Sequence, residues 1–112
     1  MKRNAGLNRN RYYWVYILLC ENNTYYTGYT NNLAKRYQSH RNGTGKCKYT
    51  RSFKPITIAQ CWRMEDKIFA MQLERAIKKL SRNDKIKIIT NPYDLSIHAF
   101  PENIAQFVSS TI

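Results

Sequence analysis

Short runs of apolar and aromatic residues, separated by turn-forming residues, mark the first part of the chain. The run Trp14 to Cys20 is rich in aromatic, Val and Ile residues, and the polar segment Glu21 to Thr24 that follows has turn chemistry. Because Tyr25 to Tyr29 resumes the pattern, the two runs predict a β-hairpin. Ile56 to Trp62 predicts a third, partly buried strand, and Pro55 is acceptable at its first position.

Apolar residues that recur every three or four positions predict two helices. The first runs from Asn32 to His40 and follows residues 30–32, which are all helix-capping types. The second runs from Glu65 to Leu80, with acidic residues near its start and lysines near its end, as the helix dipole favours. Its apolar stripe consists of Phe69, Leu73, Ala76, Ile77 and Leu80.

The remaining segments have weaker patterns. Glycines and cations predict a loop over Asn42 to Lys54, and Ile86 to Ile89 fits either a short strand or a final helical turn. A short helix from Pro101 to Val108 is expected within a less charged tail. The order strand, strand, helix, strand, helix predicts a single small α/β domain with a mixed or antiparallel three-stranded sheet.

The charge of the chain narrows the choice of partners. Nineteen Lys and Arg against seven Asp and Glu give a formal net charge of +12, and no acidic residue occurs between Glu21 and Glu65. A segment with so many cations and no acidic residue favours nucleic acid as the partner, because Lys and Arg side chains that contact phosphates release the counterions bound to the nucleic acid. A solvated basic surface is the alternative. The candidate nucleic-acid-binding residues are Lys35, Arg41, Lys46, Lys48, Arg51 and Lys54.

Other classes of protein fit less well. The longest apolar run near the N-terminus, Tyr12 to Cys20, is too short for a membrane span and has no signal-peptide features, so no membrane partner is expected. The three cysteines lack the paired spacing of a zinc site, and their odd number argues against a disulfide framework. Reduced thiols in a cytoplasmic protein are the simplest explanation. Residues 1–11 are expected to form a flexible basic arm.

Several residues have the chemistry of a catalytic site, and each also has an ordinary structural explanation. Tyr16 and Tyr26 belong to a hairpin crowded with tyrosines, where a phenol can orient water or accept a proton, although strand packing is the more frequent role. Gly28 lies inside a strand pattern, which indicates a bulge or a close approach by another group. Arg36 and His40 share a helix face and can bracket a phosphate, but a solvated basic face is more frequent.

Glu74 is the carboxylate best suited to a metal ion. It lies in the middle of the second predicted helix and borders the apolar stripe, whereas the other acidic residues lie at turns, helix starts or the tail. A magnesium ion tolerates one protein carboxylate when waters and phosphate complete its coordination. An exposed pair with Lys78, four residues later, is the alternative, and spacing alone favours it.

Taken together, these segments resemble the motifs of GIY-YIG nucleases, in particular compact stand-alone bacterial members, over roughly Tyr12 to Ile89. The segments that carry the resemblance are Val15–Ile17, Tyr26–Leu33, Arg36, His40, Lys48–Arg51 and Leu73–Lys78. Val15 and Thr27 depart from the motif glycine and isoleucine, and Tyr29 stands where some DNA-repair relatives have lysine. Residues 90–112 form a C-terminal extension to which the resemblance assigns no role.

The resemblance implies a fold, a site and a reaction. The fold would be α+β, with a small three-stranded antiparallel sheet flanked by helices. Tyr16 and Tyr26 would be the motif tyrosines, Arg36 and His40 the helix pair, and Glu74 the carboxylate that holds one Mg²⁺ or Mn²⁺ ion. A phenol would act as or support the general base on water, and Arg36 would stabilise the phosphoryl oxygens. Which of the two tyrosines loses a proton stays open.

Three functions are compatible with these features. The first is a metal-dependent endonuclease that hydrolyses phosphodiester bonds, with DNA favoured over RNA and with branched or flapped repair intermediates among its substrates. The second is a nucleic-acid-binding module that does not cut, and the third is a basic protein that docks on ribosomal RNA or an acidic protein. A domain this small is also compatible with a partner protein that supplies specificity. The oligomeric state is left open by the sequence.

Overall fold

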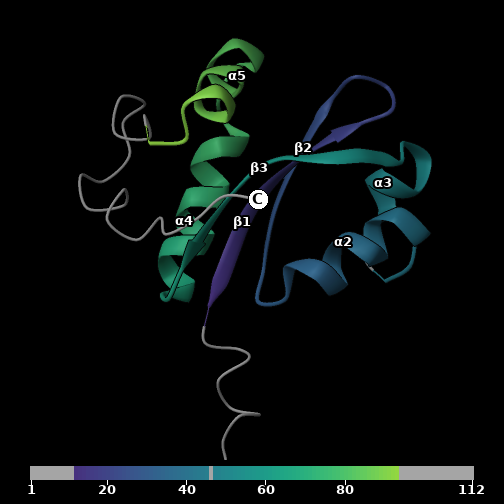
Figure 1. Ribbon diagram of the computed structural model, residues 1–112, viewed down its shortest axis with the longest axis horizontal. Coiled ribbons are helices and arrows are strands. Elements are labelled where there is room, and N and C mark those ends of the chain that lie inside the picture. The colour runs from purple at the N-terminus through teal and green to yellow at the C-terminus, as the bar shows by residue number, and fades with distance from the viewer. Residues whose placement is uncertain (1–11, 46, 94–112) are drawn as a thin grey trace, which may run out of the picture.

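A three-stranded antiparallel sheet in the order β2-β1-β3 lies at the centre of the computed structural model, which describes residues 12–45 and 47–93 (Figure 1). The strands are β1 (Tyr13–Cys20), β2 (Tyr25–Thr30) and β3 (Pro55–Met64). The predicted hairpin and third strand are therefore confirmed, and the sheet is antiparallel rather than mixed. The predicted N-terminal arm, Lys46 and the predicted helix Pro101 to Val108 lie outside the described residues.

The helices follow the capping chemistry of the sequence. Helix α2 (Leu33–Asn42) begins at Asn32, whose side chain accepts a hydrogen bond from the backbone N–H of Lys35. Helix α4 (Lys67–Lys78) begins at Asp66, whose carboxylate accepts from the N–H groups of Ile68 and Phe69. Both predicted helices are confirmed, with ends that move by one or two residues. None of the helices within residues 12–45 and 47–93 is long and apolar enough to cross a membrane.

Two segments differ from the sequence-based prediction. Helix α3 (Lys48–Ser52) lies inside the segment predicted as a loop, and its central residue Thr50 is buried. Helix α5 (Arg82–Thr90) contains Ile86 to Ile89, so the strand alternative for that segment is wrong. A Ser81 cap and the burial of Ile88 in the core explain why this stretch is helical.

The helices cover the sheet from both sides. Figure 1 shows α4 and α5 on one side of the sheet and α2 and α3 on the other. Strand alternation sends Val15 and Ile17 into the core under α4 and α5, and it sends Tyr16 and Leu18 into a second core under α2. The side chain of Tyr16 is thereby committed to the α2 side of the sheet.

Candidate active site

The side chain of Tyr16, on the central strand β1, extends over Gly28 of the edge strand β2. Tyr16 pairs directly with Gly28 in the β1–β2 register, and of the two expectations for this glycine, a bulge or a close approach by another group, the structure shows the close approach. A Cβ atom at Gly28 would lie 2.5 Å from the Tyr16 hydroxyl oxygen and 2.7 Å from Cζ, closer than real atoms approach. Gly28 therefore provides the space in which the phenol reaches the β2 edge of the sheet.

A chain of hydrogen bonds starts at the Tyr16 hydroxyl and runs between the elements on the α2 side. The phenol oxygen lies 2.8 Å from Nε2 of His40, and Nδ1 of His40 lies 2.7 Å from the hydroxyl of Thr50. The Thr50 hydroxyl in turn donates to the backbone carbonyl of Cys47 at 3.4 Å. All three side chains are buried.

The direction of each hydrogen bond in this series follows from the groups at its two ends, the Thr50 hydroxyl and the Tyr16 phenol. Thr50 has one hydroxyl proton and directs it to Cys47, so its oxygen accepts from His40, which places the imidazole proton on Nδ1. Burial raises the pKa of Tyr16, while a hydrogen bond from Arg36 lowers it in part, so the phenol keeps its proton. The phenol then donates to the lone pair of His40 Nε2.

The electrostatics keep the histidine neutral. Burial, followed by the positive charge of Arg36, lowers the pKa of His40 to about 4, so the imidazole is uncharged at neutral pH. Arg36 lies one helical turn before His40 on α2 and hydrogen-bonds the Tyr16 phenol. The hydroxyl group of Tyr16 therefore keeps its proton and contacts two groups, the neutral imidazole of His40 and the positively charged guanidinium of Arg36.

The second motif tyrosine joins the same cluster from the edge strand. The ring of Tyr26 packs edge-on against His40, with the ring centroids 5.0 Å apart. Its other neighbour is Tyr49 of α3, on which it stacks at 5.8 Å with an interplanar angle of 20°. The structure thus brings together Tyr16, Tyr26, Arg36 and His40, four of the five residues singled out for chemistry.

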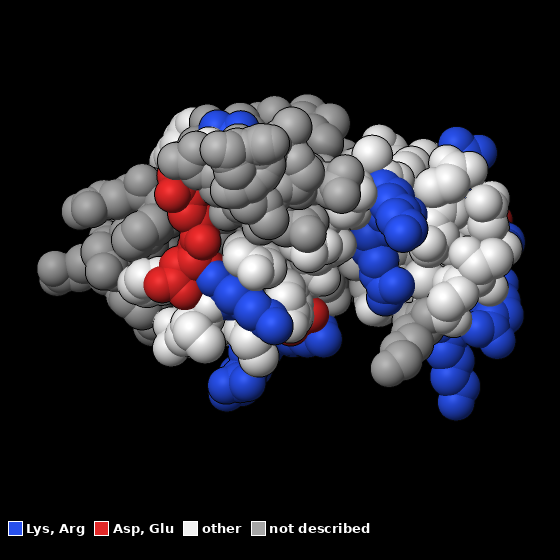
Figure 2. All heavy atoms as spheres, turned by 90° about the horizontal axis from the view of Figure 1, so that it is seen from below, with Lys and Arg blue, Asp and Glu red and all other residues white. Residues whose placement is uncertain are grey.

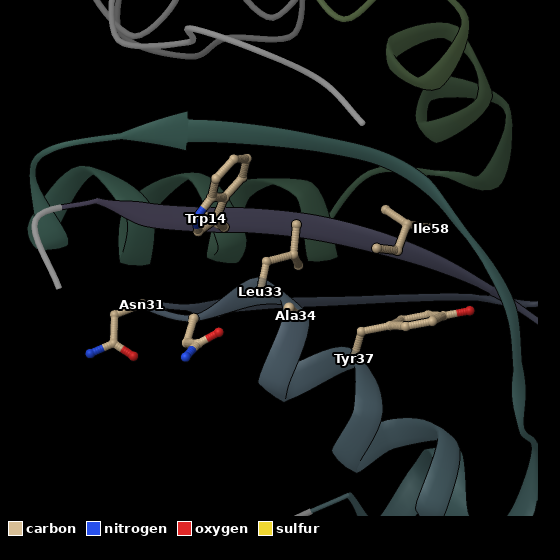
Figure 3. A pocket seen from close by; sticks show the side chains of 7 residues that line it. Trp14, Asn31, Leu33, Ala34, Tyr37 and Ile58 are labelled. Atoms are coloured by element: carbon tan, nitrogen blue, oxygen red, sulfur yellow. The ribbon is translucent and has the colours of Figure 1, made fainter. Parts of the chain in front are cut away.

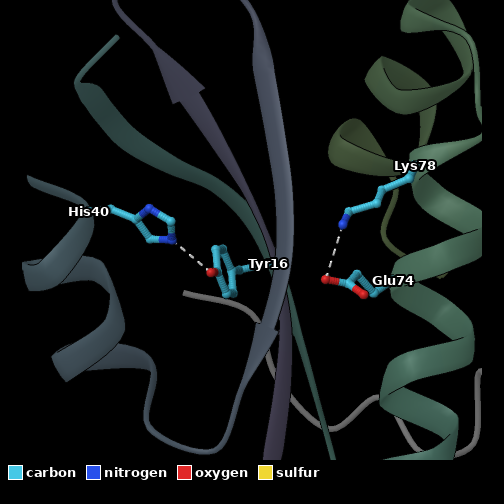
Figure 4. Close-up of polar contacts among 4 residues, drawn as sticks. All are labelled: Tyr16, His40, Glu74 and Lys78. Atoms are coloured by element: carbon cyan, nitrogen blue, oxygen red, sulfur yellow. Dashed lines mark hydrogen bonds and ion pairs between the residues drawn. The ribbon is translucent and has the colours of Figure 1, made fainter. Parts of the chain in front are cut away.

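Glu74 lies on the other side of the sheet from Tyr16 and His40 (Figure 4). Figure 4 shows it on α4, across β2 from Tyr16 and His40. Its carboxylate pairs with the Lys78 ammonium at 3.4 Å and is 20 % exposed, so the i to i+4 pair considered as the alternative is present. Within residues 12–45 and 47–93 there is no group of three or more His, Cys, Asp or Glu side chains suited to a metal ion.

The donor set around Glu74 still fits one kind of metal ion. A single, partly exposed carboxylate suits Mg²⁺, which keeps several waters and takes substrate phosphate oxygens as further ligands. Helix α4 also packs against the edge strand β2, the strand over which the Tyr16 phenol projects. A phosphate at this edge would have Tyr16 on one side of the strand and Glu74 on the other.

Comparison with known proteins shows which family the chain belongs to. The profile of the GIY-YIG catalytic domain matches residues 12–87. The chain belongs to the GIY-YIG family. It is 45% identical over 78 residues to a UPF0213 protein of Clostridium perfringens, an overlap of 70% of this chain and 83% of the relative. A UPF0213 protein of Natronomonas pharaonis is 40% identical over 79 residues, covering 70% of this chain and 92% of the relative.

A solved structure is also similar. The solution NMR structure of the UPF0213 protein BH0048 from Bacillus halodurans is 35% identical in sequence, with a TM-score of 0.44, and covers 76% of this chain and 97% of that chain. GIY-YIG membership indicates a nuclease, that is, a hydrolase whose substrate is nucleic acid. Nucleases of this family generally use a divalent metal ion.

The candidate nucleic-acid-binding residues of this GIY-YIG domain that the structure describes lie in and around α2 and α3. Lys35, Arg41, Lys48 and Arg51 are exposed and Lys54 is partly exposed, whereas Lys46 lies outside the described residues. Figure 2 shows Lys and Arg side chains on both halves of this face, whereas the acidic side chains gather mainly on the half away from α2 and α3. The half that carries α2 and α3, and with it His40, therefore presents cations with few acidic neighbours (Figure 2).

Sequence reasoning missed the residues of α3. The segment Lys48–Arg51 carries part of the resemblance to GIY-YIG nucleases, but nothing in its spacing indicated that Thr50 would bond His40 or that Tyr49 would stack on Tyr26. It also missed a hollow of about 480 Å³ lined by Trp14, Leu33, Tyr37 and Ile58, with Asn31 at its rim (Figure 3).

Proposed function

We propose that this protein is a metal-dependent endonuclease that hydrolyses phosphodiester bonds in DNA. The observation that carries the proposal is the hydrogen-bonded chain from Tyr16 through His40 to Thr50, with Arg36 beside its outer end. A phenol cannot accept a proton from water unless its own proton has somewhere to go, and here a neutral imidazole lies in hydrogen-bonding distance.

Proton movement along this chain can be followed atom by atom. As a water molecule attacks the phosphorus, its proton moves to the Tyr16 oxygen, and the original phenol proton moves to Nε2 of His40. The bond from phosphorus to the leaving oxygen breaks, and that oxygen takes a proton from solvent. In the resulting imidazolium, the proton on Nδ1 stays hydrogen-bonded to the Thr50 oxygen. The phosphate of a bound substrate places negative charge near Arg36, which reduces the penalty that the guanidinium imposes on a charged His40.

The remaining residues of the cluster bind and orient. Arg36 would donate hydrogen bonds to the phosphoryl oxygens as negative charge develops on them. Tyr26, held between His40 and Tyr49, would orient the attacking water. Glu74 would hold one Mg²⁺ or Mn²⁺ ion, which when bound supplies Lewis-acid stabilisation of the phosphate and its leaving oxygen.

Substrate binding would rest on the basic surface. Lys35, Arg41, Lys46, Lys48, Arg51 and Lys54 would contact DNA backbone, including that of branched or flapped repair intermediates. We assign the nuclease unit to residues 12–89, between a basic arm over 1–11 and an extension over 90–112, in a cytoplasmic protein. A partner protein would supply whatever specificity this small surface lacks.

A second function is favoured by one observation. The carboxylate of Glu74 is paired with Lys78 and lies across β2 from the tyrosine cluster, as suits a module that binds nucleic acid without cutting it. In that case Tyr16 and His40 would serve the packing of the α2 side only. The two functions differ in whether any phosphodiester bond is broken.

The deciding experiment is a cleavage assay on purified protein. Labelled single-stranded, duplex, flap and branched DNA and matched RNA are incubated with Mg²⁺, with Mn²⁺ or with a chelator, and Glu74→Ala is run beside the wild type. Metal-dependent cutting that is lost in the variant supports the endonuclease. Binding without cutting on every substrate contradicts it and favours the second function.

A further inference from the structure

A row of three aromatic rings leads from the active-site cluster to the surface of α3. Tyr26 stacks on Tyr49, and the ring of Tyr49 lies 5.4 Å from that of Phe53 with an angle of 48° between the planes. Tyr49 is 38% exposed and Phe53 39% exposed, although both are large apolar rings. The row thus begins against His40 and ends in solvent.

A lysine, Lys48, lies beside the exposed rings of Tyr49 and Phe53. Lys48 and Ser52 line the same open pocket of about 390 Å³ as the two exposed rings. The sequence around it contains no acidic residue from Asn22 to Met64, so the pocket lies within the basic part of the chain. An aromatic surface beside a lysine combines the two features by which proteins bind single-stranded nucleic acid, ring stacking and backbone neutralisation.

The rings are also held in place before any ligand binds. The Tyr49 hydroxyl hydrogen-bonds Thr24 and the Asn22 amide, both in the turn between β1 and β2. Its ring is supported from behind by Tyr26. A ring fixed from both ends loses little conformational freedom when a base stacks on it, which favours binding.

We propose that Tyr49 and Phe53 form a stacking surface for an unpaired base of single-stranded DNA next to the scissile phosphate. The inference rests on the proposed nuclease function and names its substrate class, because a base inside a duplex has both faces covered by its neighbours and cannot stack on these rings. Lys48 would contact a phosphate of the same strand. Tyr26 packs on both Tyr49 and His40 and so links this surface to the Tyr16–His40 pair.

Binding measurements in a chelator test the inference without requiring cleavage. Two labelled single strands of equal length are compared, one with all bases and one with abasic residues in its central segment, which preserves the phosphates and removes the rings. Wild type should bind the strand with bases about tenfold more tightly. Phe53→Ala should bind the two strands equally, and Phe53→Trp should restore the preference. Ile68→Ala, which removes an exposed apolar side chain from α4, should behave as wild type.

The outcomes separate this inference from the proposed function. Equal binding of both strands by wild type, or an unchanged preference in a Phe53→Ala protein with a wild-type melting temperature, overturns the stacking surface even if the protein cuts DNA. A base preference that Phe53→Ala abolishes supports the surface even if no substrate is cut, and that second result would refute only the nuclease. If Phe53→Ala fails to fold, Tyr49→Ser takes its place. Loss of the base preference in that variant then supports the stacking surface, and an unchanged preference overturns it.

Discussion

The phenol oxygen of Tyr16 lies 2.8 Å from Nε2 of His40, although 24 positions separate the two residues in the chain. Strand β1 holds the tyrosine, helix α2 holds the histidine, and both side chains are buried. Both groups are neutral at rest, so the pair avoids the cost of buried charge until a proton moves. The contact therefore joins two motif residues from different elements, and in the proposed mechanism it is the route by which the phenol proton would leave.

The buried, neutral state of His40 should make stability depend on pH. Burial and Arg36 lower its pKa to about 4, whereas in the unfolded chain a histidine titrates near 6.5. Between these values the unfolded state binds more protons, so stability falls as the pH is lowered from 6.5 towards 4, by on the order of 3 kcal/mol in all. Urea denaturation of wild type and His40→Gln across this range measures the effect. Parallel curves for the two proteins would contradict it.

Thr50→Val should impair catalysis through the histidine. The substitution keeps the shape of the side chain but removes the oxygen that accepts from Nδ1 of His40, so the imidazole proton is no longer held there. We expect kcat to fall about tenfold with KM little changed, since Thr50 makes no substrate contact in the proposed mechanism. The ¹⁵N chemical shifts of His40 should report the other tautomer, and Thr50→Ser should restore both readouts. Unaltered ¹⁵N shifts would rule out a positioning role.

Lys78 should compete with metal for Glu74. Its ammonium pairs with the carboxylate at 3.4 Å, so Lys78→Ala should lower the metal concentration needed for half-maximal cleavage several-fold. Glu74→Gln should abolish cleavage and leave DNA binding in a chelator nearly intact. Lys87→Ala is the matched control, because it removes a lysine paired with Asp84 at 3.7 Å on α5. If Lys78→Ala and Lys87→Ala share the metal dependence of wild type, the metal assignment fails.

Thr27 offers a test of the fold that is independent of function. Its hydroxyl oxygen is buried, and in the described part of the chain it is the one buried side-chain polar atom without a hydrogen-bond partner. Thr27→Val removes this unsatisfied group at equal volume and should raise the free energy of unfolding by about 1 kcal/mol. Thr50→Val, which breaks a bonded hydroxyl, should lower it. Chemical denaturation of both variants compares them, and a destabilised Thr27→Val would show that the hydroxyl is satisfied.

The elements that could be predicted from the sequence are those whose signals are local. The hairpin follows from two aromatic runs around a turn, and the starts of α2 and α4 follow from Asn32 and Asp66 as capping residues. The proximity of Tyr16, Tyr26, Arg36 and His40 was indicated by resemblance, because strand and helix patterns alone do not say which side of the sheet α2 covers.

Helix α3 could not be predicted because its stability is not local. Five residues with no apolar stripe do not specify a helix. What fixes the segment is the burial of Thr50 against His40 and the stacking of Tyr49 on Tyr26, both contacts with distant parts of the chain. For Glu74 the spacing allowed both an ion pair and a metal ligand, and a pair with Lys78 in the structure does not remove the second role.

Gly28→Ala tests whether the position of the Tyr16 phenol matters. A Cβ atom at this position would lie 2.5 Å from the hydroxyl oxygen and 2.7 Å from Cζ, so the ring has to move and the bond to His40 is lost or lengthened. We expect destabilisation of about 1–3 kcal/mol and a loss of turnover of about a hundredfold or more. In a Tyr16→Leu background the clash is absent, so Gly28→Ala should then cost far less stability. Additive losses in this double-mutant cycle, measured by urea denaturation, would mean that the glycine serves the strand backbone and not the tyrosine above it.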